Sequence, residues 1–364
     1  MFRPPQLPRN LEAALRDIAD AKPSVRMDAA SDLAAHGDAA RARVVPALDK
    51  ALSDADARVR AAALRALAEL RANEALPAIL VACEDDDTLV RQEAIAALGD
   101  IGDERAAGKL ERALVDARPE VRFQAVMAYP RVSRVDDDIV QVLERASRDT
   151  DEHVVHVALR MAEEVGGDDA GQGASGRVIV PAGLLVRARA LLDHASPRVR
   201  AVAAVVVTRA GGDDGIGVLV GVVNGSVATP EAEDIAAAIE LAGDRALAAA
   251  QPALEKRAFG GVLGFGRDAW SWHARTALAK MKHPRATAEI LRELSGWDRA
   301  RRTLAVVAAG EARLDAARPL LVAMRLQPRG IDVTMVDRAL TRIDGLTDDK
   351  GELSGDEPNE EEGS

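Results

Sequence analysis

The chain has 364 residues, a net charge of −11 and eight aromatic side chains, about 2% of the total. So few aromatics exclude a conventional large hydrophobic core, and one cysteine, Cys83, excludes an intramolecular disulfide and a cysteine-based zinc site. No apolar segment of the signal-peptide type follows Met1, and no apolar run reaches the roughly 18 residues of a membrane span. We therefore expect a cytoplasmic protein.

A recurring phrase, Val-Arg-x-x-Ala, organises the chain. Its five clear copies begin at Val25, Val59, Val90, Val121 and Val199, and the first four are 34, 31 and 31 positions apart. After Val59, Ala63 and Leu67 follow at four-residue spacing, which places all three on one face of a helix. Such a helix pair cannot bury its own apolar face, so a fixed period of this length predicts a stacked repeat array.

Weaker copies continue the pattern towards the C-terminus. They centre on Val154, Asp234, Trp270, Arg301 and Met335. Together the copies predict about ten helix pairs, in which abundant alanine lets the helices approach closely. Gly99 and Gly102 fall where a helix should end.

The segment 87–99, DTLVRQEAIAALG, resembles the HEAT repeat family, specifically the bacterial type named for phycobilisome lyases. The resemblance is specific for residues 11–165, weaker around 185–210 and only suggestive for 230–343. It implies an all-α fold, a right-handed α-solenoid (superhelix) of about ten HEAT-like helix pairs. It implies little about activity, because one repeat architecture serves many functions.

The composition along the chain predicts five segments. The Pro-rich residues 1–10 read as an N-terminal arm, and residues 11–165 as the regular repeats. Residues 166–180 contain the Gly-rich stretch GGDDAGQGASG and read as a flexible insertion, which either divides the array or is a long loop in an unbroken stack. Residues 181–345 hold the degenerate repeats, and 346–364 an acidic tail that we expect to be disordered.

One arginine recurs at the same place in successive repeats. The members of this ladder are Arg26, Arg60, Arg91, Arg122 and Arg200. In HEAT-like repeats such an arginine commonly meets an acidic residue of its own or the adjacent repeat, and Asp56 and Asp87, four positions before Arg60 and Arg91, fit that pattern. We favour this structural role over a phosphate-binding stripe, because the nearby acids neutralise the ladder.

Residues 256–273, KRAFGGVLGFGRDAWSWH, hold four of the eight aromatics. Their glycines and cations suit a recognition loop between two helices, in which Phe259, Phe265, Arg267 and Trp272 would contact a partner. The alternative is that these rings fill the repeat core, the role expected for Trp270.

The charge is divided unevenly. Residues 256–343 carry seventeen Lys or Arg and eight acids, a net +9, whereas residues 344–364 carry −8. Trp297, Arg299, Arg301 and Arg302 lie together in the basic segment and could bind a protein or stack on unpaired bases. The tail could compete for the same surface. Because the first 255 residues carry −12, we do not expect nucleic acid as the partner.

Catalytic chemistry has little support. No histidine is followed by Glu, as the iron sites of HEAT-like deoxyhypusine hydroxylases require, and Glu152, His153 and His156 alone make a weak metal site. Asp268 near Trp270 and Asp298 beside Trp297 only superficially match HEAT-like DNA glycosylases. We expect no catalytic residue, cofactor or metal, and a packed thiol at Cys83.

The sequence therefore predicts a non-enzymatic scaffold or adaptor that binds a protein partner with an acidic or peptide-like surface. The alternatives are an enzyme or enzyme accessory of the HEAT-like lyase or hydroxylase type, and nucleic-acid binding through the basic C-terminal third.

Overall fold

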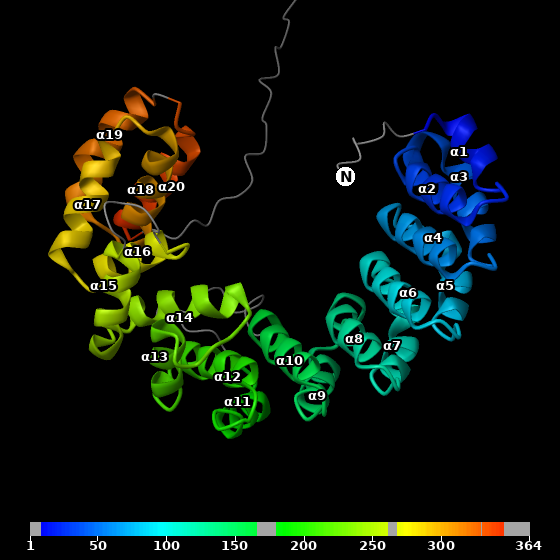
Figure 1. Ribbon diagram of the computed structural model, residues 1–364, viewed down its shortest axis with the longest axis horizontal. Helices are drawn as coiled ribbons and strands as arrows, with labels where there is room; N and C mark the ends of the chain where they lie inside the picture. The colour runs from blue at the N-terminus through cyan, green and yellow to red at the C-terminus, as the bar shows by residue number, and fades with distance from the viewer. Residues whose placement is uncertain (1–8, 166–179, 261–267, 329, 346–364) are drawn as a thin grey trace, which may run out of the picture. The chain divides into compact units, whose positions relative to one another are not determined.

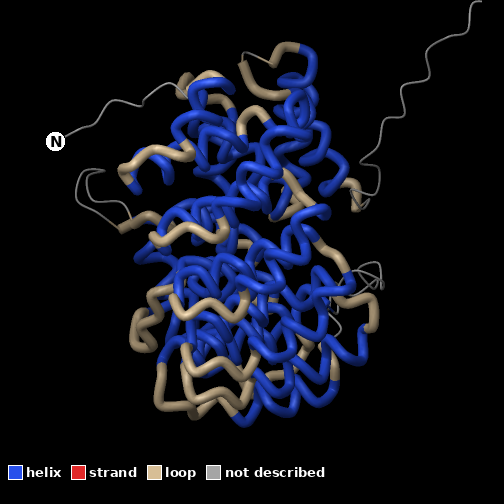
Figure 2. Tube along the Cα trace, turned by 90° about the vertical axis from the view of Figure 1, so that its right-hand side faces the viewer, coloured by secondary structure: helices blue, strands red, loops and turns tan. Residues whose placement is uncertain are grey.

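The computed structural model describes residues 9–165, 180–260, 268–328 and 330–345, and this part of the chain contains helices and turns but no strand (Figure 2). The all-α class is therefore confirmed. Contacts divide the chain into two compact units, residues 1–213 and 214–364, which we describe separately. Within the described ranges, no helix is long and apolar enough to cross a membrane.

The first unit contains the helices α1 to α12 (Figure 1). Their bounds are α1 Leu11–Asp17, α2 Pro23–Ala34, α3 Gly37–Ala51, α4 Ala57–Glu69, α5 Leu76–Ala82, α6 Thr88–Ile101, α7 Ala107–Ala113, α8 Pro119–Val132, α9 Asp136–Ala146, α10 Glu152–Val165, α11 Ala182–Ala190 and α12 Pro197–Arg209. Single turns of 3₁₀ helix, Asn73–Ala75 and Glu104–Ala106, precede α5 and α7.

The second unit contains the helices α13 to α20. Their bounds are α13 Ile216–Asn224, α14 Ala232–Asp244, α15 Gln251–Phe259, α16 Ser271–Lys280, α17 Pro284–Leu294, α18 Arg299–Glu311, α19 Arg318–Leu326 and α20 Val333–Ile343. Short 3₁₀ turns again precede two odd-numbered helices, Ala248–Ala250 before α15 and Asp315–Ala317 before α19.

The helices of each unit form two layers. Each odd-numbered helix packs on the even-numbered helix that follows it, and the even-numbered helices pack on one another in chain order, α2 to α12 in the first unit and α14 to α20 in the second. This is the stacking of an α-solenoid, in which each pair buries its apolar face on its neighbours. The handedness and the number of about ten HEAT-like repeats stay predictions.

Helix α4 shows why the repeated phrase folds as it does. The side chain of Asp56 caps the helix by accepting a hydrogen bond from the backbone N–H of Arg58. Val59, Ala63 and Leu67, predicted to share one face, are all fully buried. The helix is rich in alanine, so it can be buried on several sides without crowding its neighbours.

Glycine marks the closest approach between even-numbered helices. A Cβ atom on Gly99 of α6 would lie 2.8 Å from the Cβ atom of Ala128 in α8. The expectation that Gly99 ends a helix is therefore wrong: it lies inside α6, where only a residue without a side chain fits. Gly102 does end α6, in the left-handed conformation (φ 72°).

The weak copies vary in register. Val59 is the third residue of α4, and Asp234, Arg301 and Met335 are likewise third in α14, α18 and α20. Trp270 instead precedes α16, because the carboxylate of Asp268 accepts the backbone N–H of Trp270 in the turn before the helix. Trp270 is half-buried and contacts the ring of His273 edge-on, so it is not the buried anchor of its repeat.

The five predicted segments stay predictions, and residues 1–8, 166–179 and 346–364 lie outside the described residues. On either side of the predicted insertion, α10 packs against α12.

Candidate functional site

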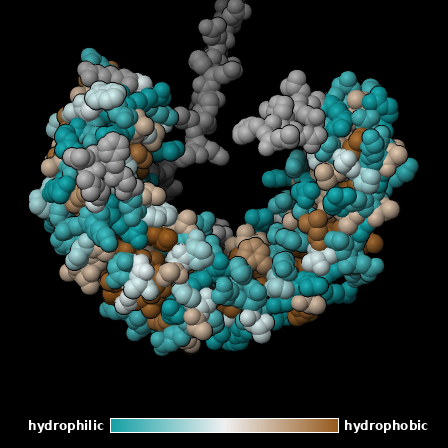
Figure 3. Space-filling view, viewed as in Figure 1, coloured by the Kyte–Doolittle hydropathy of each residue, from teal (hydrophilic) through white to brown (hydrophobic). Residues whose placement is uncertain are grey.

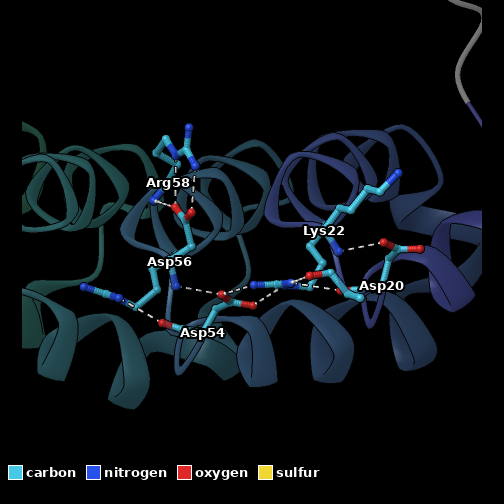
Figure 4. A network of polar contacts seen from close by, with 8 residues as sticks. Asp20, Lys22, Asp54, Asp56 and Arg58 are labelled. Atoms are coloured by element: carbon cyan, nitrogen blue, oxygen red, sulfur yellow. Dashed lines mark hydrogen bonds and ion pairs between the residues drawn. The ribbon is translucent and has the colours of Figure 1, made fainter.

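The ladder arginines link successive repeats. Arg26 of α2 donates two hydrogen bonds to the carboxylate of Asp54, at 2.6 and 2.7 Å, and a third to the backbone carbonyl of Asp20 (Figure 4). Arg60 of α4 repeats the arrangement with the carboxylate of Asp85 and the carbonyl of Asp54. Each guanidinium therefore joins the turn before its own helix to the same turn of the next repeat.

The two following arginines make the same contacts. Arg91 pairs with Asp116 at 3.0 Å, and Arg122 pairs with Asp149 at 2.7 Å. In each of the four pairs both side chains are less than one fifth exposed. Bidentate guanidinium–carboxylate pairs fix geometry as well as adding energy. We therefore expect the ladder to set the register of one repeat on the next.

The acid partners differ from those predicted. Asp56 and Asp87 were expected to pair with the arginines four positions later, and this is wrong. Both carboxylates cap their helices instead, and Asp56 also binds Arg58. The partners Asp54 and Asp85 lie two residues earlier, in the turn that faces the preceding repeat.

Within the first unit, the ladder is interrupted at one joint. Between α10 and α12, the arginine position is Val155 and the aspartate position is His194. The Nδ1 atom of His194 accepts the backbone N–H of Ser196 at 3.1 Å, as Asp54 accepts that of Asp56. Arg200 keeps the other ladder contact, donating to the carbonyl of His194. The guanidinium and its carboxylate are thus replaced together.

Because the ion pairs of the first unit lower the pKa values of its carboxylates, we expect the first unit to lose stability in acid. The hydrogen bonds from Arg26 lower the pKa of Asp54 below its ordinary 3.8, and those from Arg58 lower the pKa of Asp56 to about 2. Stabilisation from carboxylates with depressed pKa is complete above the unfolded value and is lost as the pH falls towards the folded one. We therefore expect the melting temperature, followed by circular dichroism, to fall between about pH 4 and pH 2. An Asp54→Asn variant should show a smaller fall, and an identical one would contradict the assignment.

In the basic segment, three predicted contact residues are open to solvent. Trp297, in the turn between α17 and α18, is 93% exposed. Arg299 and Arg301, in the first turn of α18, are also exposed, with Arg301 3.6 Å from the carboxylate of Asp298. Leu304 and Val307 are exposed one and two turns further along α18. Their exposure could not be predicted from the sequence, because their spacing also suits a buried face.

The predicted recognition loop is shorter than expected and its rings are partly packed. Residues 256–259 end α15, and residues 271–273 begin α16. Phe259 is half-buried, with the guanidinium of Arg285 4.1 Å from its ring centre. Trp272 is half-buried against the guanidinium of Arg275. Both rings contact cations of their own unit, while Phe265 and Arg267 lie outside the described residues.

Arg302 lies apart from the open cations. It is the fourth residue of α18, as Arg60 is of α4, and its side chain is buried. Its guanidinium donates to the carbonyl of Gly296, six residues earlier, as that of Arg60 donates to the carbonyl of Asp54. By position and contact, Arg302 belongs to the ladder.

Histidine and cysteine do not gather into a site. Among the described residues, no three His, Cys, Asp or Glu side chains are placed to hold a metal ion. His153 contacts the carboxylate of Asp151, which caps α10. Cys83 packs against the core, and burial raises the pKa of its thiol to about 12, so the thiol stays protonated at neutral pH.

The surface of the first unit is mainly polar. Figure 3 shows hydrophilic residues over much of the visible face, with small hydrophobic areas between them. Figure 4 shows the polar contacts of two successive turns of this unit, which include Asp20 and Lys22 in one turn and Asp54 and Asp56 in the other. Stacked helix pairs of this kind define a class of repeat proteins that present extended surfaces.

Comparison with known protein families agrees with this repeat architecture. The HEAT repeat family model matches residues 45–130, which run from α3 to α8. Residues 45–130 therefore consist of HEAT repeats. No curated protein matches the sequence.

Several solved structures are similar at low identity. An engineered protein is 18% identical, with 92% of this chain and 98% of that chain covered and a TM-score of 0.36. The complex of CpcE and CpcF of phycocyanin lyase from Nostoc sp. PCC7120 is 19% identical, with 79% and 96% covered and a TM-score of 0.35. A designed armadillo repeat protein in complex with the peptide (KR)4 is 18% identical, with 56% and 100% covered and a TM-score of 0.39. Such scores carry no inference about ligands or activity.

Proposed function

We propose that this protein is a non-enzymatic HEAT-repeat scaffold or adaptor that binds another protein through the start of α18. The observation that carries the proposal is the nearly complete exposure of Trp297 beside the exposed Arg299 and Arg301. Tryptophan and arginine are the residues most enriched at the centres of protein interfaces. A partner with an acidic or peptide-like surface would complement these cations.

The neighbouring apolar residues support a protein partner. Leu304 and Val307 extend the exposed surface along α18, with Ala300 between them and the turn. An aromatic anchor beside aliphatic side chains suits the apolar core of a protein interface, with arginines at its rim. Several other cations of the segment are already held by acids of this chain, among them Arg257 by Asp268.

A site-specific crosslink tests the proposal. A photoreactive phenylalanine analogue placed at residue 297 should, in the native cell, form a crosslink to a discrete protein. The same analogue at residue 81 is the matched control, because Val81 of α5 is 73% exposed and has no role in the proposed surface. Replacing Arg299 and Arg301 with Ala should reduce the crosslink at 297 without changing the thermal melting of the protein.

Two results would reject the proposal. One is an equal pattern of crosslinks at residues 297 and 81, which would mean random contact. The other is crosslinking of residue 297 to nucleic acid alone, which would mean that the basic segment binds nucleic acid instead of a protein.

A further inference from the structure

Two positions of the first-unit repeats lie close to the ladder but are not fixed by it. One directly precedes the aspartate that binds the ladder arginine, and in successive repeats it holds Ser53, Glu84, Val115, Arg148 and, before His194, Asp193. The other lies four residues before the aspartate, in the last turn of an odd-numbered helix, and holds Lys50, Val81, Arg112, Arg145 and Ala190. The chemical character of both positions changes from repeat to repeat, so stacking alone does not select these side chains.

Between the α5–α6 and α7–α8 pairs, the two positions form an ion pair across the joint. The carboxylate of Glu84 lies 3.9 Å from the guanidinium of Arg112 and also binds the ammonium group of Lys109. The cations of α7 therefore face an acid of the preceding repeat.

The next joint keeps the arginine and lacks the acid. Arg145 of α9 corresponds to Arg112, whereas the residue that corresponds to Glu84 is Val115, an exposed valine. Arg148 adds a second exposed cation, which donates a hydrogen bond of 2.9 Å to a backbone carbonyl of α9. Within the described ranges, no ion pair joins the guanidinium of Arg145 or Arg148 to a carboxylate.

A pocket of about 530 Å³ lies at this joint, between the α7–α8 and α9–α10 pairs, which are neighbours in the stack (Figure 1). Its buried lining is apolar and includes Leu114 and Val126. Its exposed lining includes Val115, Arg145 and Arg148. An apolar pocket with a few convergent polar groups is typical of a ligand site, and this volume is in the usual range of roughly 300–1,000 Å³.

The acids of the pocket do not neutralise these two arginines. Asp116 and Asp149 line the pocket, but the carboxylate of Asp116 is paired with Arg91 and that of Asp149 with Arg122. The negative charge of the first 255 residues acts only over short range, because salt screens exposed charges beyond about 8 Å at physiological ionic strength. The local cations therefore favour an anionic ligand.

We infer that this pocket, which we call the Arg145 pocket, binds a peptide segment of a partner protein in which an aliphatic side chain lies next to carboxylates. The aliphatic side chain contacts Leu114 and Val115, and the carboxylates accept hydrogen bonds from the guanidinium groups of Arg145 and Arg148. The inference concerns a surface of the first unit and does not rest on the proposed function.

Methyl NMR of the full chain tests the inference, with acetyl-Glu-Leu-Glu-amide as the probe peptide. The methyl signals of Leu114, assigned with a Leu114→Met variant, report what enters the pocket. We expect the peptide to shift them saturably and to leave the signals of Val81, an exposed valine outside the pocket, unchanged. Acetyl-Gln-Leu-Gln-amide and acetyl-Glu-Ala-Glu-amide should each bind at least about threefold more weakly, because one lacks the charges and the other the aliphatic group.

A variant that copies the neighbouring joint locates the site. Val115→Glu supplies an acid to Arg145, as Glu84 does to Arg112, and this acid competes with the carboxylates of the peptide. Val115→Gln is the matched control, because it has the same size and no charge. We expect the dissociation constant of acetyl-Glu-Leu-Glu-amide to be at least about threefold higher for Val115→Glu than for Val115→Gln.

Removal of the two arginines gives an independent check. Arg145→Gln with Arg148→Gln should raise the dissociation constant by about threefold to tenfold, since two exposed ion pairs are lost. Arg131→Gln with Arg134→Gln is the matched control, because it removes the same charge near the C-terminal end of α8, outside the pocket. All variants should keep the circular dichroism spectrum of the unsubstituted protein.

Four results would overturn the inference. An equal effect of the charged and neutral peptides would mean that the pocket does not recognise carboxylates, and so would equal binding by the Val115→Glu and Val115→Gln variants. An equal loss in the Arg131 and Arg134 control would mean diffuse attraction to the whole surface. Tighter binding of octanoate than of the acidic peptide would mean that the pocket accepts a fatty acid rather than a peptide.

Discussion

Replacing Gly243 of α14 with Ala should destabilise the second unit by about 1–3 kcal/mol, although alanine is the better helix former. A Cβ atom on Gly243 would lie 2.6 Å from the Cα atom of Ala277 and 3.0 Å from its backbone oxygen in α16. Backbone atoms cannot rotate away, so α14 and α16 would have to separate. Separation loses dispersion contacts along the whole interface between the two helices.

The matched control is Gly217→Ala in α13. Nothing lies within 4 Å of a Cβ atom there, so the same substitution should stabilise by about 0.5–1 kcal/mol through helix propensity alone. Urea unfolding followed by circular dichroism measures both changes. Equal effects of the two substitutions, in either direction, would show that close helix approach is not what selects glycine at residue 243.

The same close approach recurs in both units. Gly99 faces Ala128 between α6 and α8, and Gly310 faces Ala339 between α18 and α20. Gly99, Gly243 and Gly310 are each the twelfth residue of their helix. Glycine in a helix interior usually marks an end or a kink, so local rules assign these positions incorrectly. Only the stacking of one repeat on the next explains them.

The sequence predicts what depends on local periodicity. The Val-Arg-x-x-Ala phrase defines a helix and its buried face within a dozen residues, and Val59, Ala63 and Leu67 are buried as that spacing requires. Repetition then implies stacking, because a single helix pair leaves its apolar face exposed. The all-α solenoid class follows from these two steps.

Contacts between repeats could not be predicted from local spacing. Arg60 binds Asp85, which is 25 positions away, although Asp56 lies at the helical distance that favours a pair. The choice depends on the turn of the next repeat, which approaches the guanidinium only after stacking. A sequence signal did exist: an aspartate recurs six residues before the ladder arginine in four of the five clear copies.

The solvent exposure of side chains in the candidate surface could not be predicted from the sequence either. Phe259, Trp272 and Trp297 have the same chemical character, yet Phe259 and Trp272 pack on arginines while Trp297 is 93% exposed. Arg301 and Arg302 are adjacent, and only Arg302 is buried. Helix rotation separates adjacent residues by about 100°, so small differences in register decide which one faces solvent.

A double substitution that copies the natural interruption at Val155 and His194 should destabilise the protein less than the sum of its two single substitutions. Arg60→Val alone removes three hydrogen bonds of a charged donor and leaves the carboxylate of Asp85 without its guanidinium, so we expect a loss of about 1–3 kcal/mol. Asp85→His alone leaves Arg60 without its carboxylate, at a similar cost. Because the histidine can still accept the backbone N–H of Asp87, the turn itself should persist, as it does at His194.

The double variant Arg60→Val with Asp85→His should be more stable than the sum of the two losses predicts, by at least about 1 kcal/mol. A paired replacement leaves neither a desolvated guanidinium nor a desolvated carboxylate, and that mismatch is the main cost of breaking such a pair. Urea unfolding at pH 7 of the unsubstituted protein, the two single variants and the double variant completes this double-mutant cycle. The same cycle on Arg58 and Asp56, where the arginine is mostly exposed, is the control and should give a smaller coupling energy. Additive losses at Arg60 and Asp85 would mean that the ladder only lies between the repeats, without holding one in register on the next.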